Sequence, residues 1–398
     1  FFFFFFFFFF FFFFFFFSFL VARIRRNDKV SSLTAAVRVD GHAYGLLGPL
    51  ASACPAGPLA LAPLPQRGLA DVRPTTTVFA YEGAGVAVNL TFASPKFMAD
   101  LDSYTPVALA TVAVQSTDGQ AHRVEVFFEL AGQFAVDSDG SNVSWARNAN
   151  MHLPAGAQSM RIFNPAGQAL RQYTPYTPGT QQGGQPTEHL DWGAAHLTAL
   201  PGPAALQTWM GSSNVARALF AANGSLPMSD ETIMPLPACR TGVCRCQPGG
   251  RGRDNDWPSL TAMWAFGVLN GTAPVHARAI LAYDDLGASA RYFNITLGEY
   301  WRRTGRTLPD VVAEVAAQFD ALLARCSQYD IQLMDVMYRA GGADFAAIGA
   351  LSYRQVLADN TLVFFPGLVG PTTGQRFAPG PFLFVKGLGS RFCFGHWQ

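Results

Sequence analysis

The sequence has little charge and almost no excess of either sign. Charged residues make up 14% of the 398 residues, and the formal net charge is +1. Binding to nucleic acid or to an anionic lipid surface normally needs an excess of basic side chains. The composition therefore gives no electrostatic reason to expect either as a partner.

Known catalytic and cofactor-binding motifs are also missing. The sequence contains no nucleophile motif, P-loop, dinucleotide fingerprint or metal-binding helix. The Gly83 and Gly85 pair lies between two alternating segments and indicates a hairpin turn rather than a phosphate-binding loop. We therefore expect no cofactor.

Cysteine is scarce, with six residues in the chain. Cys239, Cys244 and Cys246 lie close together in the Gly/Arg-rich segment 236–258. A zinc site would need a second ligand pair at matched spacing, and the sequence has neither that pair nor a nearby histidine. We expect no metal, and we interpret the three as disulfide candidates in a surface insertion. Cys326 is expected to be a buried thiol.

The first residues depart from this balanced composition, because 1–17 are unbroken phenylalanine. Such a run is long enough to span a bilayer and could also form the apolar core of a signal peptide. No basic residue precedes it, however, and no small-residue cleavage site follows. We interpret 1–29 as a low-complexity leader that is an artefact, a signal or an anchor. A membrane is a partner only if this leader is genuine.

Five Asn-X-Ser/Thr sequences are more than so few asparagines would give by chance. This excess predicts passage through the secretory pathway and a secreted or cell-surface location. The expected glycosylation acceptors are Asn89, Asn142, Asn223, Asn270 and Asn294.

Period-two alternation dominates the region 30–275. Asp40–Gly41 and Gly83–Gly85 mark the turns of two predicted hairpins. The alternating segments 107–115 and 124–130 predict a third hairpin. Further strands are predicted at 142–148, 158–163, 192–197, 262–268 and 277–283. Their regular spacing favours an antiparallel β-sandwich with one buried face formed by Val124, Val126 and Phe128.

Helical periodicity is sustained only between Pro309 and Ala358. Thr307 is placed to cap the first helix, and Gly341–Gly342 is placed to interrupt the second. We expect these helices to pack antiparallel and to leave one apolar face exposed. A short amphipathic helix is also predicted at 297–303.

Few residues are candidates for chemistry. Asp284 and Asp285 are adjacent at a predicted strand end, where a paired acid site is possible and a turn-initiating role is favoured. Arg354 and Gln355 either face a site or hold their helix to its neighbour. The periodicity of the sequence does not separate these two roles.

Several separated strings carry a resemblance to a known family. They are PTTTVFAYEGAGVAVNLTFASP (74–95), PVALATVAVQSTDGQAHRVEVFFEL (106–130), LDWGAAHL (190–197), AILAYDDLGASARYF (279–293) and AGGADFAAIGALSYRQVLA (340–358). Together these strings resemble the fungal-type glutaminase A family. The resemblance implies a β-sandwich, here 30–275 with the insertion 236–258, followed by an α/α-toroid like that of six-hairpin glycosidases. The segment 276–388 would be the start of this toroid, and 389–398 an aberrant tail.

The family's name implies hydrolysis of L-glutamine to glutamate and ammonia. By motif position, the resemblance suggests Tyr353, Arg354, Gln355 and Lys386 as residues that line the site. Much of the toroid that carries catalytic residues in such folds is missing here, so we expect a fragment without activity. Two alternatives remain open: a carbohydrate-active, glycoside hydrolase-like protein, and a non-catalytic sandwich that binds glycan or supports assembly.

Overall fold

Tight turns organise the chain into antiparallel strands. We describe a computed structural model, which covers residues 33–48, 51–52, 59–136, 142–149, 151–165, 193–231, 236–237, 258–271, 273–287, 290–292, 295–369 and 376–385. Asp40 and Gly41 both have positive φ, as do Ala84 and Gly85, and each pair closes a two-residue hairpin. The two hairpins expected at these turns are confirmed.

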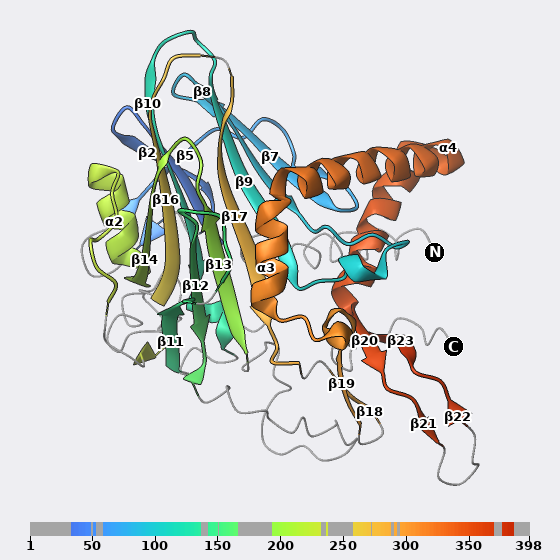
Figure 1. The fold of residues 1–398 in the computed structure, drawn as a ribbon. Coiled ribbons are helices and arrows are strands. Elements are labelled where there is room, and N and C mark those ends of the chain that lie inside the picture. Colours follow the sequence, from blue (N-terminus) through green and yellow to red (C-terminus); the bar gives the residue numbers. More distant parts are fainter. Residues whose placement is uncertain are drawn as a thin grey trace, which may run out of the picture.

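Two large sheets form most of the molecule (Figure 1). The first sheet has six strands in the order β14 (Ala205–Ser212), β16 (Pro258–Leu269), β10 (His122–Ala131), β1 (Leu33–Val39), β2 (His42–Leu47) and β5 (Ala62–Pro63). The second has nine, in the order β15 (Leu236–Pro237), β11 (Asn142–Arg147), β12 (Gln158–Phe163), β13 (Ala194–Leu200), β17 (Val275–Asp284), β9 (Val107–Ser116), β8 (Val86–Ala93), β7 (Thr76–Gly83) and β6 (Asp71–Val72). All these neighbours are antiparallel except β2 and β5.

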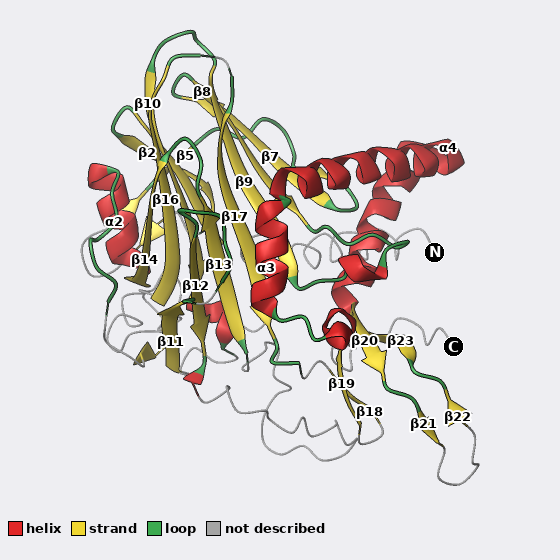
Figure 2. Cartoon of the chain, in the orientation of Figure 1, coloured by secondary structure: helices red, strands yellow, loops and turns green. Residues whose placement is uncertain are grey.

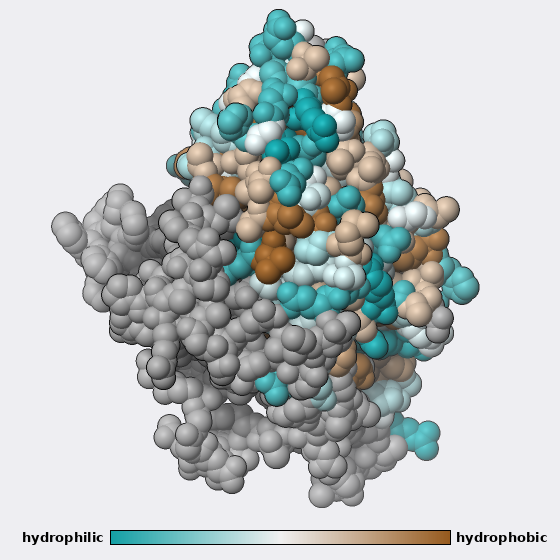
Figure 3. All heavy atoms as spheres, turned by 90° about the vertical axis from the view of Figure 1, so that its left-hand side faces the viewer, coloured by the Kyte–Doolittle hydropathy of each residue, from teal (hydrophilic) through white to brown (hydrophobic). Residues whose placement is uncertain are grey.

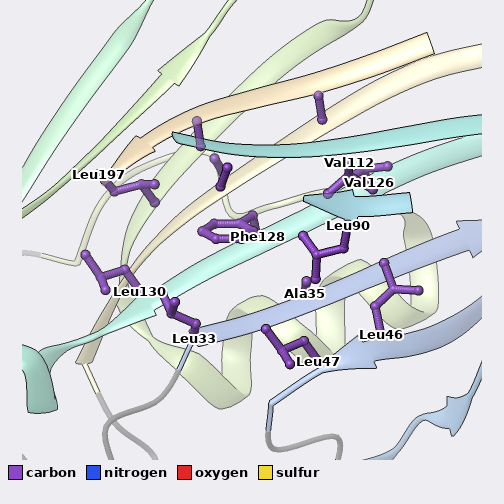
Figure 4. Packing of buried hydrophobic residues seen from close by; sticks show 14 of the residues in the cluster. Leu33, Ala35, Leu46, Leu47, Leu90, Val112, Val126, Phe128, Leu130 and Leu197 are labelled. Carbon is purple, nitrogen blue, oxygen red and sulfur yellow. The ribbon is translucent and has the colours of Figure 1, made fainter. Parts of the chain in front are cut away.

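The main core lies between the two sheets (Figure 4). Val124 and Val126 are 0% exposed and Phe128 is 1% exposed, which confirms the predicted buried face of β10. Phe128 packs across the sandwich against Phe92 of β8, with ring centroids 6.3 Å apart. Burial of these apolar faces supplies the main driving force for association of the sheets.

The predicted hairpin between 107–115 and 124–130 is wrong. Both segments are strands, but β9 pairs with β8 and β17, whereas β10 pairs with β1 and β16. The connection between them therefore passes from one sheet to the other. Alternation shows which side chains share a face, but it does not specify the hydrogen-bonding partner of a strand.

Helix α2 (Ser213–Asn223) covers the outer face of the six-stranded sheet, and no sequence pattern had indicated it. Ser212 caps its first turn, and Gly224 ends it in the left-handed conformation with φ 64°. Phe220 packs on Phe127 of β10 at a centroid distance of 5.0 Å. Figure 3 views the molecule from the side of α2, where the described surface is a mixture of hydrophilic and hydrophobic residues.

Helices α3 (Leu308–Ala317) and α4 (Phe319–Asp359) lie on the side of the nine-stranded sheet (Figure 2). Thr307 and Asp310 form a complete capping box at the start of α3, as the sequence indicates. Leu308, Val311 and Val312 are buried in a second core. The sheet contributes residues such as Leu109, Leu200 and Ile280 to this core.

Gly342 divides α4 into two helical halves, because its φ of 79° and ψ of −168° are not helical. Tyr329 stacks near Tyr353 at a centroid distance of 5.9 Å, and Met337 packs against Gly349. These pairs show that the two halves of α4 run antiparallel, as predicted. The prediction is wrong for α3, because a single residue connects it to α4 and the two helices meet at a steep angle (Figure 1). Large apolar side chains of α4 are also exposed, as expected: Ile331, Val336, Tyr338, Phe345, Ile348 and Val356.

The remaining described elements are short. β18 (Ala290–Tyr292), β19 (Ile295–Glu299), β20 (Asn360–Phe365) and β23 (Gly380–Val385) form a four-stranded sheet. Two ribbons pair β3 (Ala51–Ser52) with β4 (Leu59–Ala60), and β21 (Leu368–Val369) with β22 (Arg376–Phe377). The helix predicted at 297–303 is instead the end of β19 and a 3₁₀ helix, Tyr300–Thr304, because Gly298 and Glu299 pair with β20. No helix within the described ranges combines the length and apolarity needed to cross a bilayer.

Candidate functional site

The predicted acidic pair lies at the end of β17, where it forms a turn. Asp284 accepts a hydrogen bond from the backbone N–H of Leu286 at 2.9 Å, and Asp285 accepts one from Gly287 at 3.0 Å. Leu286 and Gly287 both have positive φ. The side-chain bonds thus replace the backbone partners that this turn lacks, which agrees with the turn-initiating interpretation.

Arg302 joins this turn to Glu299, a carboxylate that sequence analysis did not single out. One terminal guanidinium nitrogen of Arg302 lies 2.6 Å from Oδ1 of Asp284, and Nε lies 3.1 Å from Oε2 of Glu299. The guanidinium also stacks over Trp301 at 4.1 Å from the ring centroid. Asp284, Asp285, Glu299 and Arg302 form what we call the acidic cluster.

Glu299 is the most perturbed member of the acidic cluster. Burial raises the pKa of its carboxyl to about 8, and the negative charge of Asp285 adds to the shift, although Arg302 opposes it. Glu299 is therefore mostly protonated at neutral pH, whereas an ordinary glutamate is ionised. A protonated carboxyl beside an Asp–Arg pair can donate a proton to a bound group.

His196 lies in β13 of the nine-stranded sheet, which also contains Asp284, and the sequence had not indicated it as a candidate. In the strand register it lies opposite Ala282, two pairs away from Ala194 and Asp284. Burial lowers the pKa of the imidazole to about 4, so the ring is neutral at pH 7. Its Nδ1 lies 3.1 Å from Nδ2 of Asn148. Because the amide nitrogen can only donate, Nδ1 accepts and the ring proton resides on Nε2.

Tyr353 and Arg354, which were predicted to line a site, both bond to the sandwich. The Tyr353 hydroxyl donates to the carbonyl of Lys96 at 2.8 Å. Arg354 donates to the carbonyl of Arg73 at 2.6 Å and to the Thr77 hydroxyl at 2.7 Å. Of the two roles that the sequence left open for Arg354, these contacts match the one that holds the helix to its neighbour.

Asp330 completes this contact between α4 and the sandwich. Its side chain is fully buried. Oδ1 accepts from the backbone N–H and the hydroxyl of Thr75 at 2.7 and 2.8 Å, and Oδ2 accepts from the Thr76 hydroxyl at 2.6 Å. Burial raises the pKa of Asp330 despite these hydrogen bonds. We call Asp330, Tyr353 and Arg354 the α4 anchor.

The other predicted site residues are distributed as follows. Gln355 is half-buried on α4, and Lys386 lies outside the described residues. Asn89, Asn142, Asn223 and Asn270 are exposed, and Asn294 lies outside the described residues, as do Cys239, Cys244 and Cys246. Cys326 is a buried free thiol, and burial raises its pKa to about 12. Among the described side chains, no group of three or more His, Cys, Asp or Glu is arranged to hold a metal ion.

The comparisons with known proteins give a family and distant matches among solved structures. A candidate kojibiose phosphorylase from human microbiome matches with a TM-score of 0.36 and 8% sequence identity over 83% of this chain. This chain covers 32% of that protein's length. No curated protein matches. A family model described as a domain of unknown function, DUF5127, matches residues 75–336. This match covers more than half of the chain, which therefore belongs to the DUF5127 family.

Proposed function

We propose that the β-sandwich is a non-catalytic structural module that binds a helical domain and fixes its orientation. Helices α3 and α4 are the described part of that domain. The observation that carries this proposal is the α4 anchor. Asp330, Tyr353 and Arg354 come from both halves of α4. Their polar groups bond to the start of β7, to the segment that precedes it and to the segment that follows β8. The anchor therefore fixes both halves of α4 on the sandwich at once.

The energetics of burial support this role. A buried charge is costly unless hydrogen bonds replace its lost hydration, and here the sandwich supplies them. Burial lowers the pKa of Arg354 to about 10, and the nearby Asp330 only partly offsets this shift. Because each charge needs its own partners, the helices fit the sheet in one orientation. The apolar core under α3 strengthens the association of the helices with the sheet, but it does not specify their orientation, because the hydrophobic effect is non-directional.

Variants of Arg354 test this role directly. Arg354→Met keeps much of the side-chain volume but leaves the Arg73 carbonyl and the Thr77 hydroxyl without their partner. We expect faster hydrogen–deuterium exchange throughout the second half of α4. Arg339→Met is the matched control, because Arg339 is an exposed arginine of α4 that pairs with Asp335 within the helix. Equal exchange in both variants would contradict the proposal that the sandwich binds and orients the helices.

For the chemistry of the whole protein, we propose a carbohydrate-active, glycoside hydrolase-like enzyme as a second candidate function. The acidic cluster is the observation that favours it. Cleavage of a glycosidic bond needs one protonated carboxyl and one ionised carboxylate. Burial raises the pKa of Glu299, which suits this residue to the protonated role, and Asp285 is the neighbouring acidic residue whose charge adds to that shift. The finer assignment, hydrolysis of L-glutamine, is supported by the family resemblance of the sequence strings.

Parallel assays separate these activities. Purified protein would be incubated with L-glutamine, measuring ammonia, and with α-linked disaccharides, measuring free sugar with and without inorganic phosphate. Sugar release that is lost in Glu299→Gln and kept in Glu314→Gln, an exposed control, would support the carbohydrate activity. Ammonia release without sugar release would overturn it and support the glutaminase assignment. If neither product forms, the structural module stands alone as the function of this chain.

A further inference from the structure

The imidazole of His122 lies between two carboxylates at one end of the sandwich. Its Nδ1 is 2.6 Å from Oδ2 of Asp40, and its Nε2 is 3.0 Å from Oδ1 of Asp118. An ionised carboxylate can only accept a hydrogen bond. Both ring nitrogens must therefore donate, and this arrangement requires the charged imidazolium. We call Asp40, Asp118 and His122 the His122 cluster.

The His122 cluster connects the two sheets. Asp40 lies in the β1–β2 turn, and His122 is the first residue of β10, both in the six-stranded sheet. Asp118 follows β9 of the nine-stranded sheet. The cluster therefore lies where the chain passes between the sheets, near the upper end of the molecule in Figure 1.

A third turn packs directly against the ring. A Cβ atom added to Gly85, in the β7–β8 turn, would lie 2.3 Å from Nε2 of His122 and 2.6 Å from a carboxylate oxygen of Asp118. Gly85 also accepts a hydrogen bond from the backbone of Thr117 at 2.9 Å. His122 itself is 9% exposed. The ring is therefore enclosed by turns from both sheets, and its charge is matched by the two aspartates.

We propose that the His122 cluster is a pH-sensitive clamp that holds these three turns together in mild acid and releases them as the pH rises. A neutral imidazole has one donor, so deprotonation leaves one carboxylate facing a ring nitrogen that can only accept. Loss of the Nε2 proton places the repulsion on Asp118, which follows β9 of the nine-stranded sheet, and loss of the Nδ1 proton places it on Asp40 in the β1–β2 turn. The proposal is independent of any catalytic activity of the chain.

The neighbouring groups define the direction of the effect. Asp40 and Asp118 are the titratable groups that face the ring, whereas the β7–β8 turn contributes Gly85 and the neighbouring strand β16 contributes Leu269. Hydrogen bonds to Asp40 and then Asp118 raise the pKa of His122 above its ordinary 6.5. Hydrogen bonds from His122 and then from the Arg123 backbone lower the pKa of Asp40 below 3.8. Hydrogen bonds from the Gln120 backbone and then from His122 lower the pKa of Asp118 below the same value.

The sign of the linkage follows. The stability from the raised histidine pKa is fully present below 6.5 and is lost as the pH rises through the higher folded value. The stability from the lowered aspartate pKa values is present above 3.8 and is lost as the pH falls through the lower folded values. The clamp is therefore strongest between about pH 4 and about pH 6.5.

An NMR titration and amide exchange on the intact chain test the clamp. The His122 ring should titrate above the ordinary histidine value, and Asp118→Asn should lower its pKa. Between about pH 5 and about pH 8, exchange of the Thr117 and Arg123 amides, corrected for intrinsic rates, should accelerate on the order of tenfold, the size expected from loss of one hydrogen bond. Both amides bond within these turns.

The variant His122→Gln should show no such pH dependence, whereas His42→Gln should behave as the wild type. His42 is the exposed first residue of β2 and serves as the matched control. A His122 pKa at or below the ordinary value would overturn the clamp, as would equal corrected exchange at both pH values. If His122→Gln does not fold, the wild-type titration alone decides.

Discussion

Helices α2 and α4 pack on opposite sides of the sandwich, and they bury charge in different ways. Under α2, Arg217 makes two hydrogen bonds to Glu129, at 2.9 and 2.5 Å, and one to Thr34 at 3.0 Å. This ion pair is almost fully buried. Under α4, Asp330 and Arg354 bond mainly to neutral groups of the sandwich.

The comparison shows two ways of fixing a helix to a sheet. The Arg217–Glu129 pair neutralises itself, so it is self-contained and joins one turn of α2 to β10. In the α4 anchor each charge depends on several neutral partners, so the orientation of the whole helical hairpin matters. Arg38 of β1 adds hydrogen bonds to the carbonyls of Ala221 and Ala222 at the end of α2. The comparison predicts that the attachment of α2 depends mainly on the Arg217–Glu129 pair, whereas that of α4 depends on a distributed set of bonds.

The largest effect is expected when the α2 pair is broken. Arg217→Met leaves the buried Glu129 carboxylate without its counter-charge, which costs about 3–5 kcal/mol in comparable buried pairs. Chemical denaturation would measure this loss of unfolding free energy. Arg67→Met is the control, because Arg67 forms an exposed pair with Glu82. A loss no larger than in this control would show that the α2 pair is not the main attachment.

A smaller effect is expected at the α4 anchor. Asp330→Asn keeps the shape of the side chain but weakens three hydrogen bonds, and should cost about 1–3 kcal/mol. Because the folded pKa of Asp330 is raised, wild-type stability should also fall as the pH rises above 3.8, and the variant should lack this fall. Denaturation at several pH values checks both expectations. A loss of unfolding free energy as large as that in Arg217→Met would show that the α4 anchor and the Arg217–Glu129 pair do not differ in this way.

The smallest effect is expected on the exposed face of α4. Val336 is 62% exposed, so Val336→Gln should change the unfolding free energy by less than about 0.5 kcal/mol. Val315→Gln in α3 provides the buried counterpart, because Val315 is only 7% exposed. Denaturation curves of the two variants would be compared with the wild type. Substantial destabilisation by Val336→Gln would mean that this face is covered in solution.

Local features of this fold were predictable from the sequence, whereas long-range partners were not. The Asp40–Gly41 turn, the Thr307 cap and the break at Gly342 follow from backbone preferences of a few neighbouring residues. The strands β9 and β10 were identified, yet their partners were not, because alternation is the same in either sheet.

The candidate site was harder to predict for a related reason. Asp284 and Asp285 attracted attention as neighbours in sequence, but the perturbed carboxylate is Glu299, which reaches them only through the fold. Asp330 lies in an ordinary helical segment. Its partners Thr75 and Thr76 are 255 and 254 positions away in the sequence. Burial is what changes the chemistry of these groups, and a single sequence does not display it.

The passage of the chain from β9 to β10 also has a consequence for folding kinetics. Because the two strands enter different sheets, the six-stranded sheet must pair Leu33 with Leu130 and Ala131 with Ser259, so it contains few contacts between neighbours in sequence. Neither sheet can be completed from one contiguous stretch of chain. Pairings of this kind require closure of long loops before their hydrogen bonds form, which slows folding relative to hairpin-rich sheets of similar stability. The two sheets should therefore form together, in a single cooperative step.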